Sequence, residues 1–140
     1  MGLKLQLLKD GKVIYQMPVT VDELDVGGVR RELEEFEEDL SKIQAFHDFF
    51  SNETRIRMLR EMVRGFGCRF SELMETLDAN QKIISENLHR MLELRMIQRI
   101  EKHPREVQYK PSPLGIASFL TCMAMRRIMD EIEEASGEYR

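Results

Sequence analysis

The sequence predicts a mainly helical α+β protein, and three observations carry this prediction. Apolar residues recur at helical spacing in three successive segments between residues 52 and 94. A β-prone stretch over residues 97–110 follows, divided by a polar turn. Near the amino terminus, apolar and polar residues alternate on both sides of Asp10-Gly11, a strong hairpin turn. Three helices followed by a strand, a turn and a strand are the order of a winged helix-turn-helix, here with an added amino-terminal hairpin.

The first of the three helices is predicted over residues 52–64. A capping-type cluster, Ser51 to Arg55, opens it, and the glycines at positions 65 and 67 end it. Its apolar face consists of Ile56, Leu59, Met62 and Val63.

A second, shorter helix is predicted, with Phe70, Leu73, Met74 and Leu77 on its apolar face, and the turn formers at positions 78–80 follow it. The third helix covers residues 80–94, with Ile84, Leu88, Met91 and Leu92 at helical spacing. Its outer face is polar. Such a face is expected of a recognition helix that contacts a binding partner. It is also expected of an ordinary amphipathic helix in a small bundle, whose polar residues are simply solvated.

The wing is predicted over residues 97–110. Ile97 and Ile100 lie in its first strand, Lys102 to Arg105 form the turn, and Val107 and Tyr109 alternate in the second strand.

Two motifs in this region resemble the ArsR-like winged-helix regulators, over residues 49–115. The run from Ser51 to Leu59 looks like the opening helix motif of that family, and the run from Ser85 to Met91 looks like its recognition-helix signature. Glu53 replaces the usual proline, and Arg95 replaces the usual helix-ending glycine, at a cost on the order of 1 kcal/mol. The resemblance implies a homodimer whose first and last helices form the two-fold interface, with two recognition helices in successive major grooves.

Charge is distributed unevenly along this acidic chain, whose formal net charge is −4. Residues 55–110 hold twelve Lys or Arg against eight Asp or Glu, a net of +4, whereas residues 19–54 hold three against eleven, a net of −8. A DNA-binding surface needs a local basic stripe, because each cation that neutralises a phosphate releases counterions. The asymmetry favours double-stranded DNA as a partner.

Candidate DNA contacts are the side chains that the third helix and the wing leave outside. Gln81 suits an adenine edge, Lys82 a guanine edge, and Glu86 a cytosine edge or a neighbouring cation. On the third helix the candidates are Asn80, which is best placed as the cap, Gln81, Lys82, Ser85, Glu86 and His89. In the wing they are Lys102, His103, Arg105, Gln108 and Lys110, for phosphates or the minor groove. Arg55 fits a structural salt bridge at least as well as a DNA contact.

Two further amphipathic segments flank this domain. One is a heptad stripe of Val29, Leu33, Phe36, Leu40, Ile43, His47 and Phe50. It fits packing on its own domain and contact with a second subunit equally well. The other is a helix from about residue 112, whose broad apolar stripe consists of Ile116, Phe119, Leu120, Met123, Ala124, Ile128 and Ile132. The predicted dimer interface consists of Leu33, Phe36, Leu40, Ile43, Phe119, Leu120, Met123 and Ile128.

These patterns divide the chain into four segments. They are an amino-terminal β-hairpin (1–20), a linker with an acidic amphipathic helix (21–50), the winged helix-turn-helix (51–111) and a carboxyl-terminal dimerisation helix (112–136). Both flanking helices are expected to be long.

Other classes of function find little support in the sequence. There is no phosphate-binding glycine loop and no nucleophile motif, so we expect no enzyme and no cofactor. Cys68 and Cys122 are single cysteines without metal-ligand spacing, which predicts buried thiols rather than a metal site. No apolar run reaches 18 residues, so we expect a cytoplasmic protein that does not span a membrane. The prediction is a homodimeric DNA-binding regulator, open to a small-molecule effector; the alternative is a winged-helix protein-interaction module that does not read DNA sequence.

Overall fold

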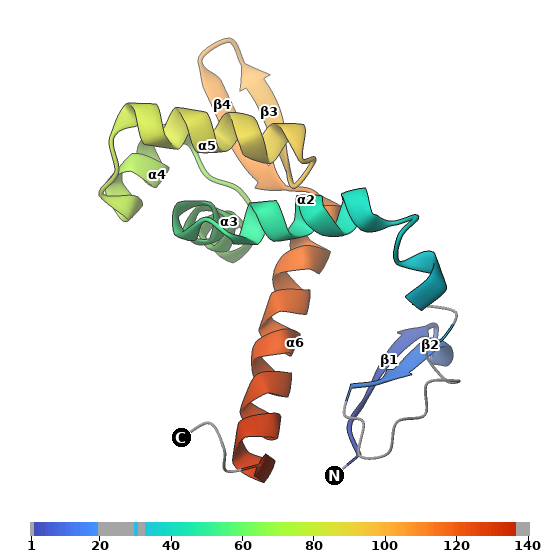
Figure 1. Cartoon of the computed structure of the whole chain (residues 1–140). Coiled ribbons are helices and arrows are strands. Elements are labelled where there is room, and N and C mark those ends of the chain that lie inside the picture. Colours follow the sequence, from blue (N-terminus) through green and yellow to red (C-terminus); the bar gives the residue numbers. More distant parts are fainter. Residues whose placement is uncertain (1, 20–29, 31–32, 137–140) are drawn as a thin grey trace. The chain divides into compact units, whose positions relative to one another are not determined.

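The computed structural model describes residues 2–19, 30 and 33–136 (Figure 1). These residues divide between Ser41 and Lys42 into two compact units, which we treat separately. The architecture is mixed α and β, as predicted, with two small antiparallel hairpins, each a two-stranded sheet.

The amino-terminal unit contains the predicted hairpin. Strands β1 (Lys4–Lys9) and β2 (Lys12–Pro18) pair with Leu7 opposite Tyr15. Asp10 and Gly11 connect them with φ angles of 52° and 79°, the two positive values that a tight hairpin turn requires.

The acidic helix predicted to carry the heptad stripe is not continuous, contrary to the expectation from sequence. Residues 33–35 are helical, residues 36–39 form a turn, and α2 (Leu40–Phe50) begins after it. Five of the six residues from Glu34 to Asp39 are acidic, and like charges four positions apart destabilise a helix. The stripe therefore breaks at its most acidic point; Val29 lies outside the described residues.

Within α2, the residue that enters the core is Phe49 rather than a member of the stripe. Phe49 is fully buried, whereas His47 is exposed and Phe50 is half-buried. The rings of Phe46 and Phe49 both lie 4.8 Å from that of Phe50, measured between centroids.

The three predicted helices of the central domain are confirmed, and the first and third begin and end within one residue of the expected positions. They are α3 (Glu53–Gly65), α4 (Phe70–Leu77) and α5 (Gln81–Glu93). Asn52 caps α3 by accepting a hydrogen bond from the backbone N–H of Arg55.

Left-handed residues follow all three helices. Phe66 has a φ of 54°, Asp78 a φ of 48° and Arg95 a φ of 60°. Phe66, not a glycine, therefore takes the left-handed position after α3. Arg95 adopts the conformation that a helix-ending glycine would supply, at a cost of about 1 kcal/mol relative to glycine.

The wing consists of β3 (Ile97–His103) and β4 (Glu106–Pro111), with Arg99 opposite Tyr109. Cys68 forms a bridge to Tyr109 through two backbone hydrogen bonds of 3.0 and 2.8 Å. This bridge attaches the segment between α3 and α4 to the wing.

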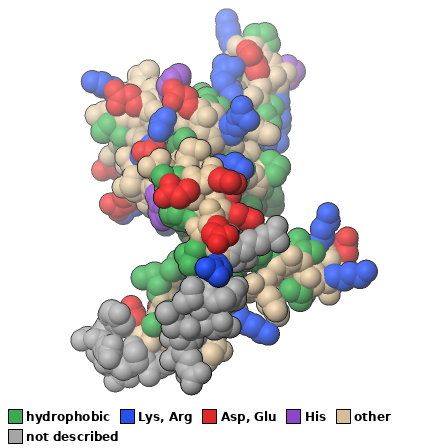
Figure 2. Space-filling view, turned by 45° about the vertical axis from the view of Figure 1, so that its right-hand side comes forward, with side chains coloured by type: hydrophobic (Ala, Val, Ile, Leu, Met, Phe, Trp, Pro, Cys, Tyr) green, Lys and Arg blue, Asp and Glu red, His purple; other side chains and the backbone are tan. Residues whose placement is uncertain are grey.

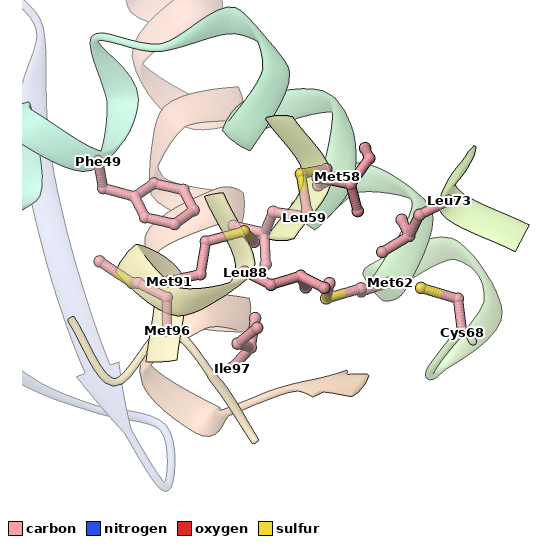
Figure 3. Packing of buried hydrophobic residues seen from close by; sticks show 11 residues of the cluster. Phe49, Met58, Leu59, Met62, Cys68, Leu73, Leu88, Met91, Met96 and Ile97 are labelled. Atoms are coloured by element: carbon pink, nitrogen blue, oxygen red, sulfur yellow. The ribbon is translucent and has the colours of Figure 1, made fainter. Parts of the chain in front are cut away.

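The core lies between α2, α3, α4, α5 and β3, and Figure 3 shows its packing. Its fully buried members include Phe49, Met58, Leu59, Met62, Leu73, Ile84 and Met91. Burial of each such side chain stabilises the fold by about 1.5–3 kcal/mol. Methionines are prominent in this cluster, and their flexible side chains fill irregular spaces between helices.

The last helix, α6 (Pro113–Ser136), is fixed at its start and extends away from the other helices of its unit (Figure 1). The Ser112 hydroxyl donates to the Arg95 carbonyl (2.7 Å) and accepts from the Gly115 N–H (2.9 Å). No helix in the described part of the chain is both long enough and apolar enough to cross a bilayer.

Gly115 is predicted to be indispensable at this junction. A Cβ atom there would lie 2.0 Å from the carbonyl oxygen of Met96, a backbone atom that cannot move aside. Gly115→Ala should therefore lower the free energy of unfolding by about 3 kcal/mol, measured by urea denaturation.

Gly65→Ala is the matched control, because a Cβ at Gly65 meets nothing within 4 Å. It should leave stability unchanged or raise it by up to about 1 kcal/mol. Equal effects of the two substitutions would contradict the close approach of α6 to the Met96 carbonyl, just before β3.

Candidate nucleic-acid interface

The orientation of α5 follows from its buried face. Ile84, Leu88 and Met91 are 0%, 3% and 0% exposed. The opposite face carries exposed polar side chains, namely Gln81, Lys82, Ser85, Glu86 and His89. The structure thus brings these five predicted contact residues together on one exposed surface.

Asn80, the sixth candidate on this helix, serves as its cap. Its side-chain oxygen accepts a hydrogen bond of 2.9 Å from the N–H of Ile83. The observed contact of Asn80 is therefore structural.

The wing candidates divide into two groups. Lys102, His103 and Arg105 are exposed at the end of the hairpin. Gln108 and Lys110 are half-buried, and the stem of Lys110 lies beside Gly67 at the opposite end of β4. Figure 2 shows Lys and Arg side chains along the projecting hairpin, with fewer carboxylates among them.

The two elements differ in charge. Along α5, Lys82 and Arg90 are balanced by Glu86 and Glu93, with Lys82 3.9 Å from Glu86. His89 lies 2.8 Å from Glu93. The hairpin from 97 to 111 has four Lys or Arg against two Glu. The excess positive charge of this surface therefore belongs to the wing.

A groove of about 240 Å³ separates α5 from the wing. Ser85 and His89 line it from α5, and Arg99 and Tyr109 line it from the wing. Arg99 and Tyr109 are not among the predicted site residues. Arg99 lies in a run, 97–100, whose apolar residues give the stronger signal, although its register opposite Tyr109 places both side chains on one face of the hairpin.

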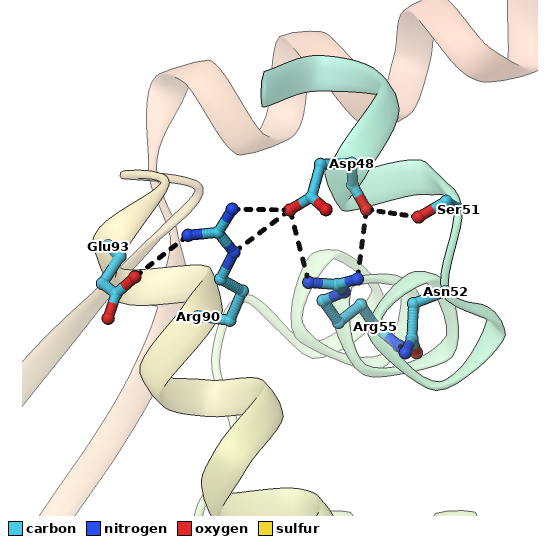
Figure 4. Close-up of polar contacts among 6 residues, drawn as sticks. All are labelled: Asp48, Ser51, Asn52, Arg55, Arg90 and Glu93. Carbon is cyan, nitrogen blue, oxygen red and sulfur yellow. Dashed lines mark hydrogen bonds and ion pairs between the residues drawn. The ribbon is translucent and has the colours of Figure 1, made fainter. Parts of the chain in front are cut away.

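A polar cluster joins α5 to two other helices (Figure 4). Asp48 of α2 accepts two hydrogen bonds from Arg90 of α5, from Nη2 at 2.8 Å and from Nε at 3.1 Å. Arg55 of α3 donates to the backbone carbonyl of Asp48 at 3.1 Å. Hydrogen bonds to Asp48, and secondarily to Glu93, raise the pKa of Arg90.

The contacts of Arg55 favour one of its two predicted roles. Its side chain is only 10% exposed, and its Nη1 lies 3.7 Å from the Asp48 carboxylate. Arg55 therefore forms the structural salt bridge.

The two cysteines lie in different elements. Cys68 is buried beside a cavity of about 140 Å³ that Glu61 and Glu72 also line, whereas Cys122 is only half-buried. Burial, and then the charges of Glu72 and Glu61, raise the pKa of Cys68 from 9.0 to about 12, and burial also raises the pKa of Cys122. Within the described ranges, no three His, Cys, Asp or Glu side chains are grouped so that they could hold a metal ion.

The exposed apolar residues of α6 differ from those predicted. Leu120 and Met123 are exposed as expected, but Met125 and Met129 are exposed as well, at 53% and 50%. Met125, Ile128, Met129 and Ile132 follow the i, i+3, i+4, i+7 spacing of a single helix face. The predicted stripe runs through Met123 and Ala124, and it therefore misses Met125 and Met129.

Comparison with solved structures identifies the fold. A putative MarR-family transcriptional regulator from Enterococcus faecalis V583 is 19% identical, with a TM-score of 0.60 over 70% of this chain and 91% of that one. The transcriptional repressor BigR from Xylella fastidiosa is 16% identical, with a TM-score of 0.57 over 68% and 93%. NadR in complex with 4-hydroxyphenylacetate is 14% identical, with a TM-score of 0.52 over 85% and 86%.

The chain has the winged-helix fold. No protein-family model and no curated protein sequence matches it. The similarity to these regulators is therefore one of structure, at low sequence identity.

Removal of the Asn80 cap should destabilise α5. We expect Asn80→Ala to lower the free energy of unfolding by about 1 kcal/mol, because the Ile83 N–H loses its acceptor. Asn80→Asp preserves an acceptor and should retain wild-type stability in the same thermal or urea experiment. Equal losses in both variants would show that the cap is not the stabilising contact.

Cys68 should make stability depend on pH above 9. Its thiol stays protonated in the folded protein up to about pH 12 but ionises near 9.0 when unfolded. The contribution of this thiol to the free energy of unfolding is thus complete below pH 9. Above pH 9 it declines by about 1.4 kcal/mol per pH unit.

The measurement is the difference in unfolding free energy between wild type and Cys68→Ala at pH 8, 9, 10 and 11. Other titrating groups cancel in this difference, which should shift steadily in favour of the variant above pH 9. A difference that stays constant would contradict the raised pKa.

Proposed function

We propose that this protein is a transcription regulator that binds double-stranded DNA as a homodimer. The observation that carries the proposal is the exposure, on one winged helix, of a polar outer face on α5 and of Lys102 and Arg105 on a hairpin with an excess of cations. α5 would enter the major groove, and the wing would contact phosphates or the minor groove.

Each element has a separate task in this proposal. Gln81, Lys82 and Ser85 lie at the amino-terminal end of α5, the part of a recognition helix that reaches base edges. Lys102 and Arg105 would neutralise phosphates, which supplies affinity without sequence information. The remaining candidates, Glu86, His89, His103, Gln108 and Lys110, would refine these contacts, while Asn80 holds the first turn of the helix.

The apolar surface of α6 supports the homodimer. Met125 and Met129 are half-exposed on a helix that extends from its domain, and Leu33 and Phe36 are 60% and 47% exposed. The exposed apolar side chains on one face of α6 form the kind of surface that usually marks an interface. A two-fold dimer would place two α5 helices about 34 Å apart on one face of the duplex.

Among winged-helix regulators we favour the ArsR-like type. The motifs around Arg55 and His89 support it, and so does the left-handed backbone of Arg95, where that family has glycine. NadR, of the same fold, was solved with 4-hydroxyphenylacetate. By analogy, we infer that a small-molecule effector controls this protein too.

The balanced charge of α5 favours one alternative, a protein-interaction module that does not read DNA. Helix residues 81–93 contain two Glu against one Lys and one Arg. Duplex binding separates the two functions.

Charge reversal tests the DNA-binding surface. Lys82→Glu and Arg105→Glu, made together, should weaken binding to a random-sequence duplex at least tenfold in fluorescence anisotropy at 50 mM salt, because the variant repels phosphates. Raising the salt to 200 mM should weaken wild-type binding strongly.

Arg60→Glu is the matched control. Arg60 is exposed on the face of α3 opposite its buried residues, outside α5 and the wing. Affinity should fall by less than threefold. If wild type shows no binding at low salt, the protein-interaction alternative replaces the proposal.

The dimer is tested by a charge on the α6 stripe. Met129→Glu should convert a protein with the mass of two chains into a single-chain species in light scattering, because a carboxylate would be buried in the interface. Arg126→Glu, on an exposed polar position of the same helix, should remain dimeric. A wild-type mass of one chain would contradict this part of the proposal.

A further inference from the structure

Asp48 links the recognition helix to the rest of the domain. Its Oδ2 atom lies 2.8 Å from Nη2 and 3.1 Å from Nε of Arg90, a two-point contact between α2 and α5 (Figure 4). In contrast, the hydrogen bonds from Asn87 to Ile83 and from Arg90 to Glu93 close within α5.

Asp48 is itself held in place. Its backbone carbonyl accepts hydrogen bonds from the Ser51 hydroxyl at 2.7 Å and from Arg55 Nη2 at 3.1 Å. Phe49, the next residue, is fully buried in the core. The carboxylate therefore belongs to a fixed part of α2, and Arg90 on α5 is the partner that it orients.

The apolar packing around α5 does not by itself fix the exact rotation of the helix, whereas a directional bond can. Apolar burial selects which face of α5 points inward, but it is non-directional. Met58, Met62, Met91 and Met96 make up much of the surrounding core, and methionine adapts its shape readily. Two N–H donors of one guanidinium that meet a single carboxylate oxygen constrain both the distance and the angle of the contact.

The pair is too exposed to serve mainly for stability. The side chains of Asp48 and Arg90 are both 43% exposed, and ion pairs at such positions contribute little to folding. The effect of this ion pair on the orientation of α5 is larger than its effect on stability, because rotation of α5 would change the positions of Lys82, Ser85 and His89 together.

We propose that Asp48 is a positioning residue for DNA recognition, which fixes the rotation of α5 through Arg90. This inference rests on the proposed function. It gives α2, which lies outside the proposed DNA-contacting surface, a part in positioning that surface.

The sign of the effect of Asp48→Asn distinguishes positioning from simple electrostatics. The substitution removes a negative charge, so electrostatics alone predicts tighter DNA binding. We expect the opposite for a duplex that the wild-type protein enriches from a random library: at least tenfold weaker binding. Binding to a random duplex should stay within threefold of wild type, because phosphate contacts tolerate a rotated helix.

Glu93→Gln is the matched control. It removes the same charge from the other carboxylate partner of Arg90, but within α5, so the link to α2 remains. Affinities for both duplexes should change by the same factor. If Asp48→Asn also changes them in parallel, or strengthens both, the inference is overturned.

Arg90→Gln separates the α2–α5 contact from the contact of Asp48 with Arg55. It should reduce discrimination between the two duplexes as Asp48→Asn does. The double variant has the net charge of wild type, and it should discriminate between the duplexes no less than either single variant. Additive losses would overturn the inference.

A measurement on the free protein keeps this inference separate from the proposed function. In Asp48→Asn, backbone amide NMR shifts should change as far as Lys82 and Ile83, about 10 Å along α5 from Arg90. In Glu93→Gln, the changes should stay near residue 93 and its two contacts, His89 and Arg90. If the amino-terminal amides of α5 do not respond to Asp48→Asn, the inference fails whether or not the protein binds DNA; if they respond but wild type enriches no duplex, only the proposed function fails.

Discussion

Burial of one face of α5 is the constraint on which the rest of the structure depends. Ile84, Leu88 and Met91 recur at spacings of four and three residues, so burying all three selects which face of the helix points inward. That orientation places the polar residues of α5 outside. It also brings Arg90 against Asp48, and α3 beneath the helix supplies Met58, Leu59 and Met62 to the same core. Surface and core are thus two consequences of a single periodic pattern.

The distribution of charge gives α5 and the wing different expected roles. The cations of α5 are matched by carboxylates on the same helix, whereas the wing holds an excess of cations. Long-range attraction to a polyanion would therefore come from the hairpin, and discrimination from α5. The groove between them, with Arg99 on one side and His89 on the other, joins the two surfaces. The acidic turn at residues 36–39 lies in a separate segment of the chain.

Local patterns in the sequence are sufficient to predict the fold. They do not predict contacts between residues that lie far apart in the sequence. The caps at Asn52 and Asn80, the three central helices and both hairpins follow from neighbouring residues. The left-handed backbone of Arg95 matches the position where the family resemblance indicated a glycine. Asp48 and Arg90, 42 positions apart, carry no local signal for their contact, and the turn at 36–39 reflects repulsion that an apolar heptad pattern does not register. Of the candidate site, the exposed set on α5 could be predicted from periodicity, but Arg99 required the register of the wing.

The most direct measurement is an NMR titration of the isotopically labelled protein with a random-sequence duplex. It reports the contact surface residue by residue and does not require an operator sequence. The account predicts that the largest amide shift changes fall at residues 81–89 of α5 and 102–106 of the wing, and that they diminish as salt is added. Unchanged spectra at low salt, or changes concentrated on α6 or the amino-terminal hairpin, would contradict it.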